Sequence, residues 1–155
     1  MSDHGGLIIT REPVTSDDAA WLMAQLSATL QCITGDSGLS SFDPQDLQHA
    51  GACFVVARNY AGTAVGCGAL RPLSTGIAEL KRMYAAEPAQ GIGRALLAFL
   101  EQEACQLGYR EIWLETRRVN QAAVRFYLRH GYQLIDNYGR YNGNLQAVCF
   151  CKVLV

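Results

Sequence analysis

The fold of this chain is decided by residues 78–104, which read AELKRMYAAEPAQGIGRALLAFLEQEA. The stretch opens with a strand-like apolar run that ends at Tyr84–Ala85 and is followed by a short turn with Pro88. From Gly91 onward the apolar residues recur with the 3.6-residue period of a helix with one buried face. The stretch therefore predicts a strand, a glycine turn and the N-terminus of a helix.

The glycine turn at Gly91 and Gly93 is suited to an anion. The first turn of a helix has unpaired N–H groups and carries the positive end of the helix dipole, and both favour phosphate. Glycine lets an anion approach where a Cβ would block it. An ordinary strand-to-helix turn explains the residues at least as well. Leu96 replaces the third glycine of the dinucleotide fingerprint, and the lysine of a P-loop is absent.

Strands and helices alternate on both sides of this stretch. Apolar runs predict strands at residues 7–11, 52–58, 65–70, 77–85, 110–116, 132–135 and 146–154. Helices are expected after a Thr15–Asp18 capping box, after Asp43–Pro44, and over residues 91–107 and 120–130. This order is typical of an α/β or α+β domain with a mixed sheet.

The composition narrows the class of protein. A length of 155 residues fits one domain spanning residues 1–155. The net charge of −1 favours neither nucleic acid nor an acidic membrane surface as a partner. No membrane-length apolar run or signal layout is found, so a cytoplasmic protein is expected. The 6 cysteines lie in apolar segments, which favours reduced core cysteines over a metal site, and no metal is expected.

Two motifs resemble those of the GNAT N-acyltransferase superfamily. Gln90-Gly91-Ile92-Gly93-Arg94-Ala95 resembles its acetyl-CoA motif, Arg/Gln-x-x-Gly-x-Gly/Ala. Asn120-x-x-Ala123-x-x-Phe126-Tyr127-x-Arg129-x-Gly131-Tyr132 resembles its second motif at every key position. The element order from Ile9 to Leu154 is also similar. The resemblance implies the α/β (α+β) fold of that superfamily, with a mixed, mostly antiparallel sheet of about seven strands flanked by about four helices.

The resemblance also implies acetyl-CoA as a cosubstrate. Backbone groups on the strand would pair with the pantetheine arm, and the helix N-terminus would hold the pyrophosphate. The implied contacts are Met83, Tyr84, Ala85, Gln90, Gly91, Ile92, Gly93, Arg94, Ala95, Asn120 and Tyr127. Asn120 has an alternative role as a helix cap. In a second register of the motif, Pro88 takes the place of a phosphate-binding residue.

Acetyl transfer to an amine has two protonation demands. The amine must lose a proton although its pKa is roughly 10, and the thiolate, from a thiol with a pKa of about 8.5, leaves more easily when protonated. The resemblance implies Tyr127 as the general acid and Glu79 as a base, with the Met83 N–H as the most plausible donor to the acetyl oxygen. The alternatives are a core aromatic at Tyr127, and a surface carboxylate at Glu79 paired with Lys81 or Arg82.

The acceptor is described only in outline. Glu115, Tyr138, Arg140 and Tyr141 would flank it, although the last three also suit a solvated hairpin tip. The chain is thus expected to transfer the acetyl group of acetyl-CoA to a primary amine of a small molecule, peptide or protein, by direct attack in a ternary complex. The alternatives are an acyl-CoA-binding sensory module without turnover and a Rossmann-type nucleotide domain, which leaves the second motif unexplained. A homodimer is left open.

Overall fold

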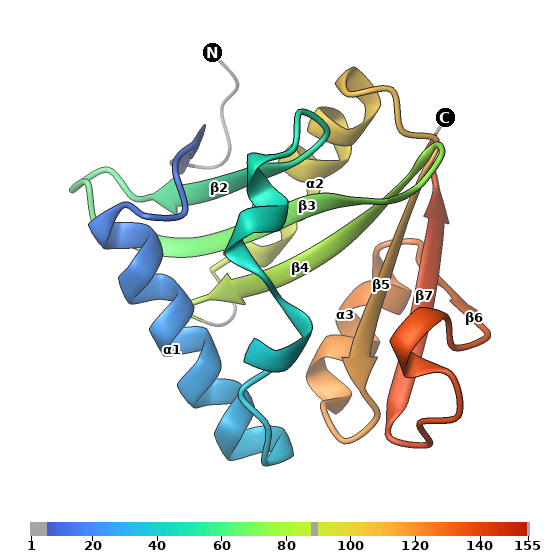
Figure 1. Ribbon diagram of the computed structural model, residues 1–155. Coiled ribbons are helices and arrows are strands. Elements are labelled where there is room, and N and C mark those ends of the chain that lie inside the picture. Colours follow the sequence, from blue (N-terminus) through green and yellow to red (C-terminus); the bar gives the residue numbers. More distant parts are fainter. Residues whose placement is uncertain (1–5, 88–89, 155) are drawn as a thin grey trace.

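The computed structural model describes residues 6–87 and 90–154 as a seven-stranded sheet with helices on both faces (Figure 1). The spatial order of the strands is β1-β2-β3-β4-β5-β7-β6. Only β4 and β5 run parallel, and every other neighbouring pair is antiparallel. The predicted mixed, mostly antiparallel sheet is confirmed. The strands are β1 Ile8–Arg11, β2 Cys53–Arg58, β3 Ala64–Ser74, β4 Ile77–Ala85, β5 Glu111–Arg117, β6 Gln133–Ile135 and β7 Ala147–Val153.

The described residues form three α-helices rather than about four. The α-helices are α1 Asp17–Thr34, α2 Ile92–Gln106 and α3 Gln121–Arg129. Three further segments are single 3-10 turns, namely η1 Leu39–Ser41, η2 Pro44–Gln48 and η3 Gly139–Tyr141. The segment after Asp43 is capped as expected, because the Asp43 carboxylate accepts from the Gln45 N–H at 3.0 Å. It stays a 3-10 turn because only five residues separate the cap from the extended His49.

Helix α1 begins one residue later than the predicted capping box. Its N-cap is Ser16, whose hydroxyl accepts from the Ala19 N–H at 3.1 Å. Gly35 ends the helix in the left-handed conformation with φ of 78°. The loop after Gly35 therefore turns sharply toward the sheet, where it meets the cavity described below.

The two sheet faces are covered by different helices. Helix α1 packs over β3 and β4 on one face, against an apolar cluster that includes Leu22, Phe54 and Val56. Helix α2 covers the other face, where Leu96 and Leu100 are fully buried. Two glycines of β3 let α2 approach closely. A Cβ on Gly66 would lie 2.7 Å from Ile92, and one on Gly68 would lie 2.7 Å from Leu100 and from Met83.

Strands β4 and β5 separate after a short contact. Only Ile77–Glu79 of β4 pairs in parallel with Glu111–Trp113 of β5, and beyond these residues the two strands diverge (Figure 1). Strand β4 carries an extra residue against β3 at this point, and Arg82 has a left-handed φ of 56°. A β-bulge of this kind bends a strand and ends its regular pairing. The bulge thus accompanies the opening in the sheet between the two strands.

The cysteines only partly follow the expectation of a core role. Cys53, Cys67 and Cys149 are buried, but Cys32 and Cys105 are exposed. The last two lie on α1 and α2, whose buried stripes fall on other residues. No group of three or more His, Cys, Asp or Glu in the described chain could hold a metal ion. Within residues 6–87 and 90–154, no helix is both long and apolar enough to cross a bilayer.

Candidate active site

A cavity of about 230 Å³ lies where β4 and β5 diverge. Its walls come from β4, β5, the α1 C-terminus with the loop after it, one side of α3, and the η3 segment. Side chains alternate in direction along the two strands, so each strand contributes to two different environments. We call these the apolar side (Leu80, Met83, Leu114, Ala123 and Tyr127) and the charged side (Asp36, Lys81, Glu115, Arg117, Arg140 and Tyr141) of the cavity.

Tyr127 lies on the apolar side, where α3 meets the sheet. Its ring packs edge-on against Tyr132, with centroids 5.5 Å apart, and lies 6.1 Å from the Phe150 ring. Burial raises the pKa of Tyr127, so the hydroxyl keeps its proton at neutral pH. Nothing in the described part of the chain hydrogen-bonds to this hydroxyl. Tyr127 therefore combines the core-aromatic role considered above with a free proton donor at the cavity wall.

Asn120 also has both of the roles that the sequence left open. Its side-chain oxygen accepts from the Ala123 N–H at 3.3 Å and so caps α3. The same residue lines the cavity. The cap fixes Asn120 at the junction of β5 and α3, where its free amide N–H groups can reach a ligand.

The N-terminus of α2 fits a phosphate group. Gly91 is the N-cap with φ of 75°, and no side chain caps the first turn. Gln90, Gly91 and Arg94 are exposed, so the orphan N–H groups of Ile92, Gly93 and Arg94 have an open approach. Pro88, which takes the place of a phosphate-binding residue in the second register of the motif, lies outside the described residues.

The surroundings of Gly93 differ from those of Gly91. A Cβ on Gly93 would lie 3.4 Å from the ring of Phe126 on α3. This distance is at the close end of ordinary van der Waals contact, so α3 lies directly against the helix surface at Gly93. Nothing lies within 4 Å of a Cβ on Gly91, where the positive φ alone favours glycine.

The strand residues assigned to the pantetheine arm lie along the gap. Met83 lines the cavity, whereas the side chains of Tyr84 and Ala85 pack into the cores on opposite faces of the sheet. Since pairing with β5 ends at Glu79, the β5-facing backbone edge of residues 80–85 has no strand partner in the described chain. An extended amide-bearing ligand can add to such an edge.

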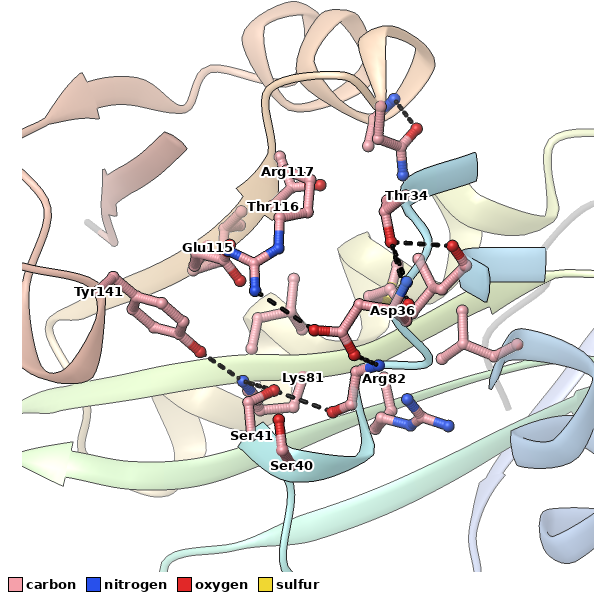
Figure 2. A pocket seen from close by; sticks show the side chains of 18 of the residues that line it. Thr34, Asp36, Ser40, Ser41, Lys81, Arg82, Glu115, Thr116, Arg117 and Tyr141 are labelled. Atoms are coloured by element: carbon pink, nitrogen blue, oxygen red, sulfur yellow. Dashed lines mark hydrogen bonds and ion pairs between the residues drawn. The ribbon is translucent and has the colours of Figure 1, made fainter. Parts of the chain in front are cut away.

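Lys81 is the most enclosed cation on the charged side. Its ammonium donates to the Tyr141 hydroxyl at 2.9 Å and to the Ser41 hydroxyl at 3.3 Å (Figure 2). Both partners are neutral, because burial raises the pKa of Tyr141 to about 12. Burial also lowers the pKa of Lys81. None of the ion pairs in the described chain includes Lys81.

Arg117 links two carboxylates across the cavity mouth. Its guanidinium lies 3.7 Å from the Asp36 carboxylate and 3.3 Å from that of Glu115 (Figure 2). Burial raises the pKa of Glu115, while Arg117 and Lys81 oppose that rise. Oε2 of Glu115 and Nη1 of Arg117, the two atoms of the 3.3 Å ion pair, are buried, and neither makes a hydrogen bond in the described structure. Glu115 therefore has acceptor capacity to spare at the cavity wall.

Glu79 has a position that the sequence did not suggest. It is 1% exposed and does not line the cavity. Arg71 binds its Oε1 at 2.8 Å through Nε and at 2.7 Å through Nη2, and the Tyr138 hydroxyl donates to Oε2 at 2.5 Å. Neither Lys81 nor Arg82 is its ion-pair partner. Glu79 and Arg71 instead form a buried, saturated pair beside the cavity.

The remaining residues predicted at the acceptor separate into two groups. Arg140 and Tyr141 line the cavity, and Arg140 donates to the Ser40 carbonyl at 2.6 Å. Tyr138 lies behind them, with its ring against Trp113 at 5.2 Å and its hydroxyl on Glu79. The alternative of a solvated hairpin tip holds only for the exposed Arg140, since Tyr141 is 3% exposed.

Four charged residues of the described chain that line the cavity were not predicted as site residues from the sequence, namely Asp36, Lys81, Arg82 and Arg117. Lys81 shares a strand face with Glu79 at a two-residue spacing, which was a usable signal. Asp36 and Arg117 carried no such signal, because their contact depends on how the loop after α1 folds over β5. Arg82, which also lines the cavity, is held by α1 through the Met23 carbonyl at 2.9 Å and the Ser27 hydroxyl at 2.5 Å.

Comparison with known proteins relates this geometry to a family. Residues 20–132 match the model of the "Acetyltransferase (GNAT) family". An IAA acetyltransferase of Azospirillum brasilense is 32% identical over 136 residues, which cover 86% of this chain and 88% of that relative. A structure described as an acyl-CoA N-acyltransferase from Klebsiella pneumoniae has a TM-score of 0.81 at 31% identity, covering 96% of this chain and 98% of that one.

A third relative was crystallised with its ligand. A GNAT family acetyltransferase from Elizabethkingia anophelis, with acetyl-CoA bound, has a TM-score of 0.72 at 18% identity and covers 97% of this chain and 99% of that one. At that identity the likeness concerns the fold. The family match over most of the chain and the two relatives above 30% identity carry the assignment. This chain belongs to the GNAT family of acetyltransferases, enzymes that use acetyl-CoA as the acetyl donor.

Proposed function

We propose that this protein transfers the acetyl group of acetyl-CoA to a primary amine by direct attack within a ternary complex. One observation carries the proposal: the Tyr127 hydroxyl and the Glu115 carboxylate line a single cavity from its apolar and its charged side. An acid and a base that face one reacting centre from opposite directions are what amine acetylation needs.

The apolar side of the cavity and the α2 N-terminus are proposed to hold acetyl-CoA, the ligand that the Elizabethkingia relative binds. The N–H groups of Ile92, Gly93 and Arg94 would hold the pyrophosphate. Backbone groups of Met83 and Ala85 and the amide of Asn120 would bind the pantetheine arm. When bound, acetyl-CoA supplies an acetyl group activated as a thioester.

Tyr127 is proposed as the proton donor to the departing sulfur. Its hydroxyl is neutral because burial raises its pKa, and the described protein leaves it without a hydrogen-bond partner. The Met83 N–H, on the edge of β4 that has no strand partner, is proposed to donate to the acetyl oxygen, where negative charge develops.

Glu115 is proposed to receive the proton of the attacking amine, directly or through water. Burial moves the pKa of Glu115 toward neutral pH, and a carboxylate with a higher pKa is a better base. Glu79, predicted as the base from the family pattern, has both oxygens occupied by Arg71 and Tyr138. It is therefore proposed to position the strand rather than to touch the amine. No cysteine is among the described residues that line the cavity, which supports direct transfer over an acyl-cysteine route.

The test is thiol release from acetyl-CoA against amino acids, polyamines, aminoglycosides, aromatic amines and peptides, beside calorimetric titration of acetyl-CoA alone. We expect acceptor-dependent thiol release, with an N-acetylated product in mass spectrometry and no acetylated enzyme during turnover. Binding of acetyl-CoA without turnover would favour a sensory acyl-CoA-binding module. Absence of binding would contradict the assignment of the α2 N-terminus.

A further inference from the structure

The charged side of the cavity has an excess of cations. Among the described residues that line the cavity, six are charged: the anions Asp36 and Glu115 and the cations Lys81, Arg82, Arg117 and Arg140. Behind Lys81, Glu79 and Arg71 form a pair that adds no net charge. The cavity is therefore positive overall, and a ligand with an anionic group would neutralise it.

The cations differ in how far the protein already satisfies them. Arg117 lies between two carboxylates, and Arg82 donates to α1 and to the Ser37 carbonyl at 3.2 Å. Arg82, Lys81 and Arg140 donate hydrogen bonds only to hydroxyl or carbonyl oxygens, but the Arg82 guanidinium is turned toward α1, where it makes three such bonds with α1 and the loop after it. Lys81 and Arg140 are therefore the cations available to a ligand on the charged side. An enclosed ammonium held only by two hydroxyls lacks the anionic partner that buried charges usually have.

The contacts of Lys81 also fix where such a partner would bind. The Tyr141 and Ser41 hydroxyls hold the ammonium from η3 and η1, two segments on the charged side (Figure 2). Arg140, next to Tyr141 in the chain, lines the same part of the cavity. Glu115 lies on the neighbouring strand β5. The positive charge of Lys81 opposes the rise in the pKa of Glu115, so the two side chains are near each other. One wall can thus bind an anion while the facing wall binds an amine.

We infer that the acceptor is a small amino acid, whose carboxylate binds Lys81, Arg140 and the Tyr141 hydroxyl while its amine lies at Glu115. The inference rests on the proposed acetyltransferase function and specifies its substrate class. The cavity volume of about 230 Å³ lies below the roughly 300–1,000 Å³ of pockets for drug-sized ligands. This volume must also admit the acetyl end of the donor, which favours a small acceptor over a large one.

The test compares acceptors that differ only in the anionic group. Thiol release is measured for free amino acids, the corresponding amino acid amides, the decarboxylated amines, and dipeptides with a free C-terminus. We expect kcat/KM to be about 10- to 100-fold higher for free amino acids than for amides, the range of one charge-assisted contact. Dipeptides that match or exceed free amino acids would overturn the small-acceptor part of the inference.

Variants connect the preference to its residues. Lys81→Met should reduce the ratio of kcat/KM between amino acid and amide to nearly 1, and Tyr141→Phe should reduce it by about 3- to 10-fold. Acetyl-CoA affinity should be unchanged in both. The control is Lys152→Met, at the only other lysine in the chain, which pairs with Glu101 outside the cavity. It should keep the wild-type ratio.

Outcomes against the inference differ from those against the function. Equal kcat/KM for amino acids and amides, or an intact preference in Lys81→Met, would overturn the inference and leave the acetyltransferase standing. If no acceptor is turned over, binding of N-acetyl amino acids and their amides to the CoA-bound protein is compared by calorimetry. Selective binding of the carboxylates that is lost in Lys81→Met supports the inference, and any other result overturns it.

Discussion

The apolar and charged sides of the cavity are built in opposite ways. On the apolar side, Tyr127 is held by aromatic packing alone, and its hydroxyl has no partner in the described protein. On the charged side, Lys81, Glu115 and Arg117 are held by ion pairs and hydrogen bonds from segments far apart in the sequence. The apolar side keeps one proton donor neutral by burial. The charged side is proposed to select a ligand by the charges that remain unmatched.

The largest effect on stability is expected between the two sides, at Glu79. Glu79→Gln breaks a buried pair and leaves Arg71 with only Asp46, so stability should fall by about 3 kcal/mol, or roughly 6–12 °C in Tm. Thermal unfolding measures this fall, with Glu115→Gln as the matched carboxylate variant. An unchanged Tm together with lost turnover would instead make Glu79 the base.

The largest effect on catalysis is expected on the apolar side. Tyr127→Phe removes a hydroxyl that contributes no described hydrogen bond to the fold, so stability should change little. Loss of the general acid should lower kcat by about 100-fold while the Kd of acetyl-CoA stays within about twofold. Steady-state thiol release and calorimetry separate the two. Unaltered kcat would remove Tyr127 from the acid role.

A smaller catalytic effect is expected on the charged side. Glu115→Gln keeps the shape of the wall but removes the base, so kcat/KM for the acceptor should fall about 10- to 30-fold. The Kd of acetyl-CoA should not change, so the loss should come from the acceptor and the transfer step alone. Asp36→Asn is the control, because it removes a carboxylate that pairs with Arg117 but leaves the proposed base in place. A loss as large in Asp36→Asn would indicate that Glu115 acts only through Arg117.

An effect of about 1 kcal/mol is expected where α2 begins. Gly91→Ala introduces a Cβ that meets no atom but is strained by the φ of 75°, a cost of about 1 kcal/mol. Relief of that strain would tilt the first turn, so acetyl-CoA binding should weaken several-fold while the KM of the acceptor is unchanged. Gly93→Ala is the comparison variant, because its Cβ would lie 3.4 Å from the Phe126 ring without the strain of a positive φ. Equal effects on both substrates in Gly91→Ala would contradict the separation of the two sides.

The smallest effect is a pH dependence of stability at Lys81. Burial lowers the pKa of Lys81 in the folded protein. At pH values between this lowered pKa and the unfolded value of about 10.4, the unfolded chain therefore binds more protons than the folded protein. Stability from this residue therefore rises with pH across that window. Lys81→Met should be more stable than the wild type near neutral pH, and the difference in Tm should shrink toward pH 10. The groups around Lys81, namely Glu79, Arg71, Glu115 and Arg140, are common to both proteins. A constant difference in Tm would show that the ammonium is well solvated.

The sequence was most informative where structure is local. The boundaries of β4, the Gly91 turn and the Asn120 cap follow from patterns within a few residues, and they define the region proposed to bind acetyl-CoA. The charged side could not be predicted in this way. Its contacts join Lys81 to Tyr141 and Ser40 to Arg140, residues that meet only after the sheet has formed.

The partner of Glu79 illustrates the same limit. Its sequence neighbours Lys81 and Arg82 were the natural candidates, yet Arg71 is its cross-strand partner in the β3–β4 register. Arg82 is turned toward α1 by the bulge in β4. Tertiary packing sets both the strand register and the positive φ of a non-glycine residue such as Arg82. No local sequence pattern predicts them.

The place of β7 in the sheet has a consequence for synthesis of the protein. This strand is the last one in the sequence, yet it lies between β5 and β6 and pairs with both. During translation, β1 to β4 with α1 and α2 can assemble early, since N-terminal segments emerge first. Strand β5 gains its antiparallel neighbour only when residues 147–153 have left the ribosome. The nascent chain would therefore form the proposed donor-binding half before it completes the wall that carries Glu115, and the proposed active site would be complete only once β7 has paired with β5.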